Sequence, residues 1–314
     1  AEPLDTPIKD KWALVIGISN FKDPALNLKY AAKDATDFRN YLVSEANFQP
    51  DHVKLLTDEQ ATRDNIVGSL GEKWLRRLAN SDDLVVIYMS SHGSAAKAEV
   101  GGANFIVPYE GNLSNLVFTG LPMQWFTAGL KDLVHCKRIL LVLDVCHGGA
   151  VAPEDAKGIY RENGIDMEKV GAGTGQIVLA SSLADQVSWE SKHYNNGVFT
   201  RRLIEGLRKN GGTTTIGDAY GYMKDKIEEE VLRDRAEVQT PVLITHLWKG
   251  KELVLQTPAI DPRPGLAVSG TAGGAEDRPL AKTVSTLRSA SSKELKPGIP
   301  TVTPAKRGNT RATH

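Results

Sequence analysis

A histidine and a cysteine stand at corresponding places in two separate parts of the chain. His92 lies in the string Ser90-Ser91-His92-Gly93, and Cys146 lies in the string Asp144-Val145-Cys146-His147-Gly148-Gly149. Each string follows an apolar run typical of a buried strand, residues 84–89 in one case and 139–143 in the other. Because functional groups in open α/β sheets gather beyond the carboxyl ends of strands, we expect the two side chains to meet. A thiol beside an imidazole predicts nucleophilic catalysis, with Cys146 as nucleophile and His92 as its base.

The backbone around these two residues offers the other group that acyl transfer needs. The amides of Gly93 and Cys146 are candidate donors to an oxyanion. Gly148 and Gly149 permit a tight turn and the close approach of a substrate backbone. A buried structural cysteine, or an unrelated loop histidine, would explain either string taken alone. The occurrence of both strings at two strand ends favours the catalytic interpretation.

Alternating apolar and amphipathic segments predict the elements that position these strings. Strands are expected at 12–18, 53–56, 84–89, 104–108, 139–143, 177–180 and 253–255, and helices at 30–48, 62–78, 122–133, 199–207 and 216–232. Strands that alternate with helices predict an α/β fold, with a mainly parallel central sheet and helices on both faces. The polar, Gly-rich stretch at 151–175 shows neither a helical nor a strand period. It predicts a long loop that is either functional or flexible.

Composition divides the chain into a catalytic domain at 1–256 and a tail at 257–314. Beyond Gln256, Pro, Gly, Ser and Thr dominate and large apolar residues are sparse, so this tail is predicted to be disordered. It is also basic, with nine Lys or Arg against four acids, although the whole chain has a formal net charge of zero. We expect the tail to act as a solvated spacer rather than as a surface-binding extension.

Overall composition also narrows the classes of partner. A neutral chain gives no reason to expect nucleic acid, and no apolar run is long enough to span a membrane. Two cysteines cannot form a disulfide framework, so Cys136 is expected to be a small buried residue and Cys146 a free thiol. The first strand is followed by no glycine-rich phosphate-binding string, which argues against nucleotide binding. The start at Ala1 is compatible with a removed signal peptide, so both a cytoplasmic and an exported location stay open.

The two strings together resemble the catalytic motifs of the caspase and metacaspase superfamily of cysteine peptidases. Metacaspases carry Ser-Gly-His-Gly and Asp-Ser-Cys-His-Ser-Gly in the same order. The runs 13–18 and 28–35 and the string Asn196-Gly197-Val198-Phe199-Thr200 also fit, so the resemblance covers about residues 10–255. It implies a caspase-like fold and an endopeptidase that acts on proteins or peptides and requires no cofactor. We expect this peptidase to be a monomer.

The resemblance also implies an acidic pocket for the substrate residue that precedes the scissile bond. The metacaspase positions that form this pocket correspond here to Asp34, Ser90 and Asp144. Carboxylates attract a basic side chain and repel an acidic one, so cleavage after Arg or Lys is expected. Without the resemblance, Asp34 would be a solvated helix residue and Asp144 a turn-capping carboxylate.

A second string bears on the same specificity. Ser188-Trp189-Glu190 stands where animal caspases carry Ser-Trp-Arg, whose Arg binds a substrate aspartate. An acid in that place removes the group that would favour aspartate. Ser188 and Trp189 are therefore further substrate-binding candidates, although Trp189 has an equally good interpretation as a buried anchor of its loop.

The resemblance implies self-cleavage as well. Family members are cut between a large and a small portion, which correspond here to about 10–150 and 176–256. The linker loop at 151–175 offers Lys157, Arg161 and Lys169 as candidate cleavage sites.

Calcium activation is the family property that the sequence matches least. Many metacaspases bind calcium through aspartates that follow the histidine loop, whereas Glu99 and Glu110 are the only acids between Gly93 and Leu130. Hard cations need several oxygen ligands, so no metal site is expected and calcium dependence should be weak or absent. The alternative function is a catalytically silent caspase-like scaffold, which Ser91 keeps open because the family has glycine there.

Overall fold

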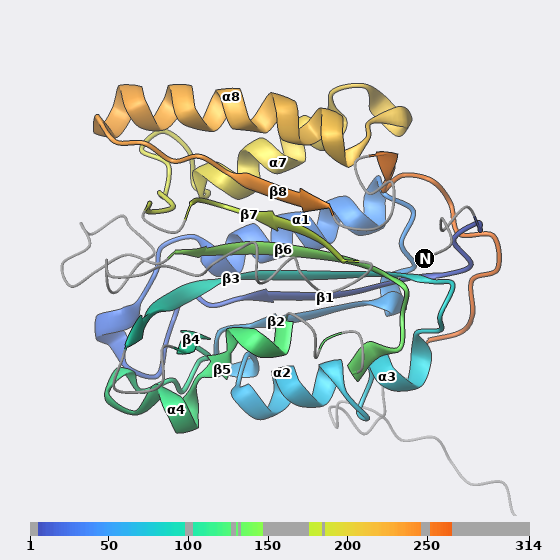
Figure 1. Cartoon of the computed structure of the whole chain (residues 1–314), viewed down its shortest axis with the longest axis horizontal. Coiled ribbons are helices and arrows are strands. Elements are labelled where there is room, and N and C mark those ends of the chain that lie inside the picture. The colour runs from blue at the N-terminus through green and yellow to red at the C-terminus, as the bar shows by residue number, and fades with distance from the viewer. Residues whose placement is uncertain are drawn as a thin grey trace, which may run out of the picture. The chain divides into compact units, whose positions relative to one another are not determined.

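A mainly parallel sheet forms the centre of the protein (Figure 1). The computed structural model describes residues 6–97, 103–126, 130, 133–146, 176–183, 186–245 and 252–265, without the side chains of residues 95–97, 103 and 146. Within them the main strand order is β2-β1-β3-β6-β7-β8. The parallel strands are β1 (Lys11–Gly17), β2 (Val53–Thr57), β3 (Leu84–Lys97), β6 (Arg138–Cys146) and β7 (Gln176–Ala180).

Three further strands run antiparallel to their neighbours. At one edge β8 (Val242–Thr245) pairs with β7. Near the catalytic strings β4 (Ala103–Ile106) pairs with the far half of β3 and with β5 (Leu121–Pro122). The predicted α/β fold with a mainly parallel sheet is confirmed.

Helices cover both faces of this sheet (Figure 1). One face carries α1 (Ala31–Ser44), α7 (Val198–Arg208) and α8 (Ile216–Arg235), and the other carries α2 (Arg63–Leu70), α3 (Leu75–Leu78) and α4 (Leu116–Thr119). Single 3₁₀ turns link many of these elements; they are η1 (Pro24–Leu26), η2 (Pro50–His52), η3 (Asp58–Gln60), η5 (Leu113–Asn115), η6 (Met123–Phe126) and η7 (Gly211–Thr213).

The register between β3 and β6 decides which residues share a face. Ser90 lies beside Asp144, and His92 lies beside Cys146. Tyr88 packs in the apolar cluster under α1, α7 and α8, whereas Met89 packs in the cluster under α2. Because side chains alternate along a strand, Ser90 and His92 follow Tyr88 onto the α1 face.

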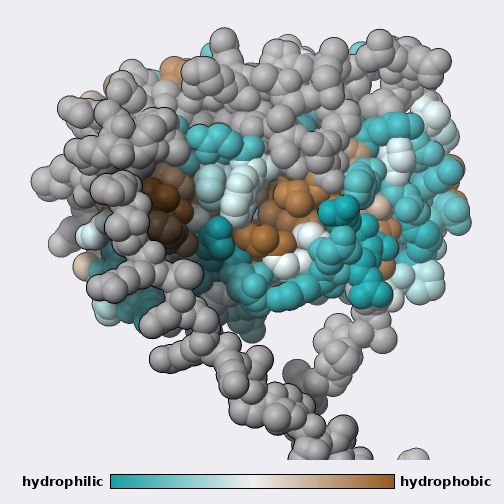
Figure 2. Space-filling model, turned by 60° about the horizontal axis from the view of Figure 1, so that its bottom comes forward, coloured by the Kyte–Doolittle hydropathy of each residue, from teal (hydrophilic) through white to brown (hydrophobic). Residues whose placement is uncertain are grey.

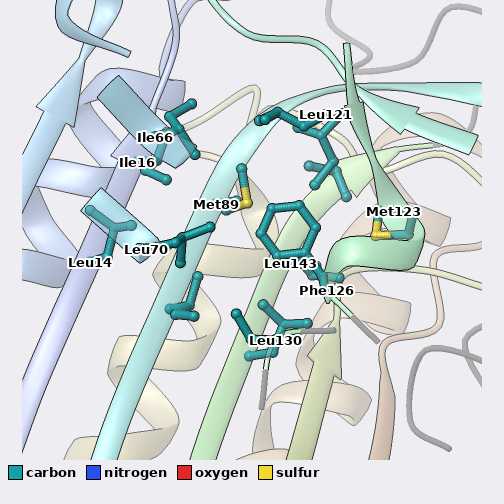
Figure 3. Close-up of a cluster of buried hydrophobic side chains, with 14 of the residues drawn as sticks. Leu14, Ile16, Ile66, Leu70, Met89, Leu121, Met123, Phe126, Leu130 and Leu143 are labelled. Carbon is teal, nitrogen blue, oxygen red and sulfur yellow. The ribbon is translucent and has the colours of Figure 1, made fainter. Parts of the chain in front are cut away.

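The opposite face carries a cluster of buried apolar side chains (Figure 3). There Met89 and Leu143 meet Ile16 of β1, Leu70 of α2 and Phe126 of η6, and all five are almost completely buried. Burial of each such side chain contributes about 1.5–3 kcal/mol to folding. This apolar layer packs against β3 and β6, the strands that carry His92 and Cys146.

Two predicted helices are interrupted, each for a local reason. The helix expected at 62–78 ends at Leu70, because Gly71 follows as the helix cap with a non-helical backbone (φ −94°, ψ −141°). A short helix resumes at Leu75. The helix expected at 122–133 is wrong at its start. Pro122 lies in β5 and pairs with Phe105, and the turn η6 follows it.

The expected strand at 253–255 is also wrong. Leu253 and Leu255 are buried in the apolar cluster, but in the described chain this segment joins no named strand and makes a single bridge from Val254 to Thr215. The last strand is instead β8, which follows Pro241 at a sheet edge. A proline directly before a short apolar run hides such an edge strand from pattern analysis.

Residues 257–265 differ from the sequence expectation of disorder. The Ile260 N–H donates to the Ile8 carbonyl at 3.1 Å, and the Arg263 N–H donates to Asp10 Oδ2 at 2.9 Å. The Arg263 guanidinium also binds the buried carboxylate of Asp83. Composition misses this attachment because backbone hydrogen bonds and one arginine, rather than apolar side chains, hold the segment. Residues 266–314 of the predicted tail lie outside the described chain.

The α2–α4 side also presents apolar surface. Viewed from that side, hydrophobic residues lie among hydrophilic ones (Figure 2). On α4, Val117 and Phe118 are exposed large apolar residues. Among the helices that the structure describes, none is both long enough and apolar enough to cross a membrane.

Candidate active site

His92 lies at the carboxyl end of the part of β3 that pairs with parallel strands. Contacts to its ring hold the side chain in place. Its Nε2 lies 2.8 Å from the Leu26 carbonyl oxygen, and its ring lies against Phe21 with centroids 5.3 Å apart. A carbonyl oxygen can only accept, so Nε2 carries the proton of the neutral ring. Nδ1 is then the basic nitrogen of the imidazole. The ring is thus fixed in one tautomer and is only 6% exposed.

The loop that supplies the Leu26 carbonyl is itself anchored. Asp58 Oδ1 accepts from the Ser19 and Asn20 amides at 2.8 and 2.9 Å, and Asn27 Oδ1 accepts from the Phe21 amide at 2.8 Å. The short turn η1 begins under an Asp23 cap with Pro24 in its first position, a sequence typical of a turn start. Sequence reasoning did not identify Leu26, since a backbone carbonyl leaves no residue-type signal.

Cys146 ends β6 directly beside His92. The register pairs the two residues across neighbouring parallel strands, as the two sequence strings predict. The side chain of Cys146 lies outside the described part of the chain. The backbone therefore brings the two residues of the predicted dyad together, and their catalytic roles stay a prediction.

The Gly93 amide faces the strand that carries Cys146. The Ser90 carbonyl accepts from the Ile18 N–H at 3.0 Å, and the His92 carbonyl accepts from the Val107 N–H at 2.9 Å, both on the side of β3 away from β6. Amides of successive strand residues point to opposite edges. The Gly93 N–H consequently points toward the β6 edge, which is the direction that an oxyanion donor requires.

Ser91 occupies its position without disturbing the strand. Its hydroxyl donates to the Val107 carbonyl at 2.7 Å, and the residue is completely buried. β3 continues regularly through it, in register with Val145 of β6. The replacement of the family glycine by serine is therefore compatible with the local geometry of the histidine strand.

Asp144 is completely buried and accepts a hydrogen bond on each carboxylate oxygen. Ser188 Oγ donates to Oδ1 at 2.9 Å, and Thr200 Oγ1 donates to Oδ2 at 3.1 Å. Gln239 Nε2 in turn donates to Ser188 Oγ at 3.1 Å. Hydrogen bonds to an ionised carboxylate are stronger than those between neutral groups, so they fix its position.

Two further predicted pocket residues lie around the Tyr88 hydroxyl. Burial raises the pKa of Tyr88 well above its ordinary value, and the carboxylates of Asp144 and Asp34 raise that pKa further. Ser90 and Thr200 both hydrogen-bond to the Tyr88 hydroxyl. Asp34, Ser90, Asp144 and Ser188 are each at most 1% exposed. The structure brings these four predicted residues together beneath the α1 face.

Asp34 also joins α1 to α7. Its Oδ1 and Oδ2 accept from the Gly197 N–H at 3.0 and 2.9 Å, and Oδ1 accepts from Asn196 Nδ2 at 2.9 Å. Asp34 is therefore a buried capping carboxylate rather than a solvated helix residue.

Glu190 makes the converse connection from the loop before α7 back to α1. Its Oε1 accepts from the Lys29 and Tyr30 amides, both at 2.9 Å, just before α1 begins. The sequence comparison treated Glu190 only as a missing arginine. The structure gives it a positioning role, since it fixes the start of the helix that carries Asp34.

Trp189 lies in the same loop and is 4% exposed. Its N–H donates to Gln239 Oε1 at 3.0 Å, and the Arg235 guanidinium lies 4.7 Å above its ring. These contacts are those of a loop anchor, and its role as a subsite wall stays a prediction. The candidate cleavage residues Lys157, Arg161 and Lys169 lie outside the described chain.

Of the two acids near the histidine loop, Glu110 is the one that lies in the described part of the chain, and weak or absent calcium dependence stays a prediction. Glu99 lies outside the described residues, and Glu110 Oε1 accepts from the Arg63 N–H at 2.9 Å at the start of α2. One carboxylate engaged in a helix start does not supply the oxygen cluster that calcium takes.

The second cysteine, Cys136, does not have the character of a reactive thiol, because burial raises its pKa to about 12.

Comparison with known proteins agrees with the fold and with the family resemblance. A family model described as the caspase domain matches residues 10–250. Metacaspase-3 of Arabidopsis thaliana is 25% identical over 253 residues, which cover 73% of this chain and 68% of that protein. Metacaspase-1 of Candida glabrata is 24% identical over 213 residues, which cover 58% of this chain and 51% of that protein. The chain thus spans about two thirds to one half of these relatives.

Solved structures show the same fold at lower identity. A protein from Geobacter sulfurreducens has a TM-score of 0.58 and 15% identity, covering 79% of this chain and 99% of that one. Caspase-1 from Spodoptera frugiperda has a TM-score of 0.53 and 14% identity, covering 82% of this chain and 94% of that one.

Proposed function

The chain belongs to the caspase-domain family, and on that premise we propose that it is a cysteine endopeptidase that cleaves after Arg or Lys. The family and its metacaspase relatives support a cysteine peptidase in general. The register that sets His92 beside Cys146 is the single observation that carries the catalytic proposal.

In the proposed reaction, His92 Nδ1 takes the proton of the Cys146 thiol. The thiolate attacks the scissile carbonyl carbon, and the Gly93 and Cys146 amides stabilise the oxyanion that forms. The C–N bond then breaks as the imidazolium returns its proton to the leaving amine. Water attacks the remaining thioester, which releases the acid product and restores the thiol. The Leu26 carbonyl keeps Nε2–H in place throughout, as an orienting group does in other nucleophile–base pairs.

The proposed specificity depends on charge. Asp144 and Asp34 lie close enough to one buried hydroxyl, that of Tyr88, for both carboxylates to raise its pKa. A pair of buried carboxylates attracts a guanidinium or ammonium group, and it would penalise a substrate carboxylate by several kcal/mol. Glu190 stands in the position of the arginine that binds a substrate aspartate in animal caspases. These features support a basic residue before the scissile bond.

Matched fluorogenic peptides that end in Arg, Lys or Asp test this proposal. Hydrolysis would be measured with wild type and Cys146→Ala, together with the rate of thiol alkylation by iodoacetamide. We expect turnover of the Arg and Lys peptides only, lost in the variant, and rapid alkylation of one thiol. Cleavage after Asp would refute the pocket. Silence on all three peptides, with slow alkylation, would favour the scaffold alternative.

Self-processing at 151–175 is a second part of the proposal. Incubated wild type should yield fragments that end at Lys157, Arg161 or Lys169, because these residues have the basic side chain that the proposed specificity requires. Intact-mass spectrometry would identify the new termini, with Cys146→Ala as the inactive control. Identical fragments from both proteins would mean that another protease cuts the loop.

A further inference from the structure

The first turn of α7 contacts both buried acids of the proposed pocket. Its cap residue, Gly197, donates its N–H to Asp34, and Thr200 in the same turn donates its hydroxyl to Asp144. Asp34 and Asp144 are 110 residues apart in the sequence and lie on different elements, α1 and β6. One rigid helical turn therefore sets the relative position of the two carboxylates.

The direction of the hydrogen bonds around Thr200 is determined. Thr200 has a single hydroxyl proton, which it donates to Asp144 Oδ2. The bond of 2.6 Å between Tyr88 Oη and Thr200 Oγ1 must then be donated by Tyr88. Burial and both acids raise the pKa of Tyr88, so the phenol keeps the proton that it donates.

Each carboxylate oxygen of Asp144 thus accepts the last hydrogen bond in a chain of two donors. One chain runs from Tyr88 through Thr200 to Oδ2, and the other runs from Gln239 through Ser188 to Oδ1. Thr200 is completely buried and belongs to a helix, whereas Ser188 lies in a loop. Groups on helices are held more precisely than groups on loops, so Thr200 is the stronger determinant of where Asp144 points.

We propose that Thr200 is a specificity-positioning residue, whose hydroxyl holds the Asp144 carboxylate in the orientation that receives the basic substrate side chain. The inference rests on the proposed function, since it requires that Asp144 binds Arg or Lys. Thr200 itself does not touch the substrate. Its loss should therefore weaken recognition of the positive charge and leave the reactivity of Cys146 in place.

Two substitutions separate the hydroxyl of Thr200 from its bulk. Thr200→Val keeps the shape of the side chain and removes the donor, and Thr200→Ser keeps the donor. The substrates are an Arg peptide and the same peptide with citrulline, which has nearly the shape of arginine and no charge. Thr200→Ala is the second donor-free variant, should the valine variant fail to fold.

Thr200→Val should raise KM for the Arg peptide about tenfold while kcat changes less than about twofold. The preference for arginine over citrulline should fall about tenfold, which is the change that a loss of about 1.4 kcal/mol produces. Thr200→Ser should recover most of that preference, and iodoacetamide should alkylate Cys146 in both variants at the wild-type rate.

Two results would overturn the inference alone. One is an unchanged arginine preference in both donor-free variants, and the other is an equal loss in Thr200→Ser and Thr200→Val. A wild-type enzyme that does not prefer arginine to citrulline would overturn the proposed specificity, and the role of Thr200 with it. The wild-type measurement therefore distinguishes the two failures.

Discussion

The two faces of β3 and β6 end differently, although the same strands form both. On the α2 face the buried side chains of Met89, Leu143 and Val145 are apolar, and the Ser91 hydroxyl beside Val145 is buried against the Val107 carbonyl. On the α1 face the sequence turns polar after Tyr88 and Val142, and Ser90, His92 and Asp144 follow at alternate positions. The α2 face supplies packing free energy, whereas the α1 face, which also carries an apolar cluster, ends in the polar residues of the proposed site. Strand alternation allows both along nine paired residues.

The polar residues on the α1 face are held in place by hydrogen bonds to other protein groups. Leu26 fixes the His92 ring, Thr200 and Ser188 fix Asp144, and Gly197 fixes Asp34. Buried polar groups are expensive unless they are paired, so each functional group on this face needs its own partner. Substitutions on the two faces should therefore change different measured quantities.

The largest loss of activity is expected when His92, the proposed base on the α1 face, is replaced. His92→Ala should lower kcat/KM for an Arg peptide by at least about a thousandfold, because the proposed base for the thiol proton is then missing. The melting temperature, measured in parallel, should stay close to that of wild type. His135→Asn is the matched control, since His135 lies at the opposite end of β6 with a positive φ of 55° that asparagine tolerates. Comparable losses in both variants would contradict the assignment of His92.

The next effect concerns the charge of Asp144. Asp144→Asn keeps the size of the side chain and should lower kcat/KM for the Arg peptide about a hundredfold, a loss of about 2–3 kcal/mol. Hydrolysis of the citrulline peptide by the same variant should change much less. An equal loss on both peptides would assign Asp144 to folding instead of specificity.

A substitution on the α2 face should lower the stability of the protein rather than its activity. Leu143→Ala leaves a cavity against η6 and should reduce the free energy of unfolding by about 2–5 kcal/mol in a urea titration. Activity per folded molecule, normalised by active-site alkylation, should stay within about threefold. A selective loss of kcat without destabilisation would break the proposed division between the faces.

The smallest effect is expected from calcium. Activity on the Arg peptide should differ less than about twofold between calcium and a chelator, because Glu110 already serves the start of α2. Magnesium at the same concentration controls for ionic strength. A strong requirement for calcium would mean that ligands outside the described residues form the site.

The sequence predicts most of the sheet and the strings at its carboxyl edge. Apolar runs and helical periodicity depend on local order, so β1, β2, β3, β6 and β7 are found within a few residues, apart from the continuation of β3 into its pairing with β4. The strand β8 and the break after Leu70 are missed, because a proline and a glycine decide them within an otherwise ambiguous pattern.

The long-range contacts that hold the site residues in place are much harder to predict. The Leu26 carbonyl, the Gly197 amide and the Thr200 hydroxyl act through contacts between residues more than 50 positions apart. Gly197 and Thr200 stand in a string that fits the family resemblance, but nothing in their type indicates these contacts. Arg263 is missed because long-range contacts, its ion pair with Asp83 and backbone hydrogen bonds, hold a segment of disordered composition.

Cleavage positions in an unfolded protein substrate test the central claim most directly. A reduced and alkylated protein would be incubated with wild type or with Cys146→Ala, and every new terminus would be identified by mass spectrometry. The account predicts cuts after Arg and Lys alone, all of them absent with Cys146→Ala. Cuts after aspartate, or the same cuts with the variant, would contradict it.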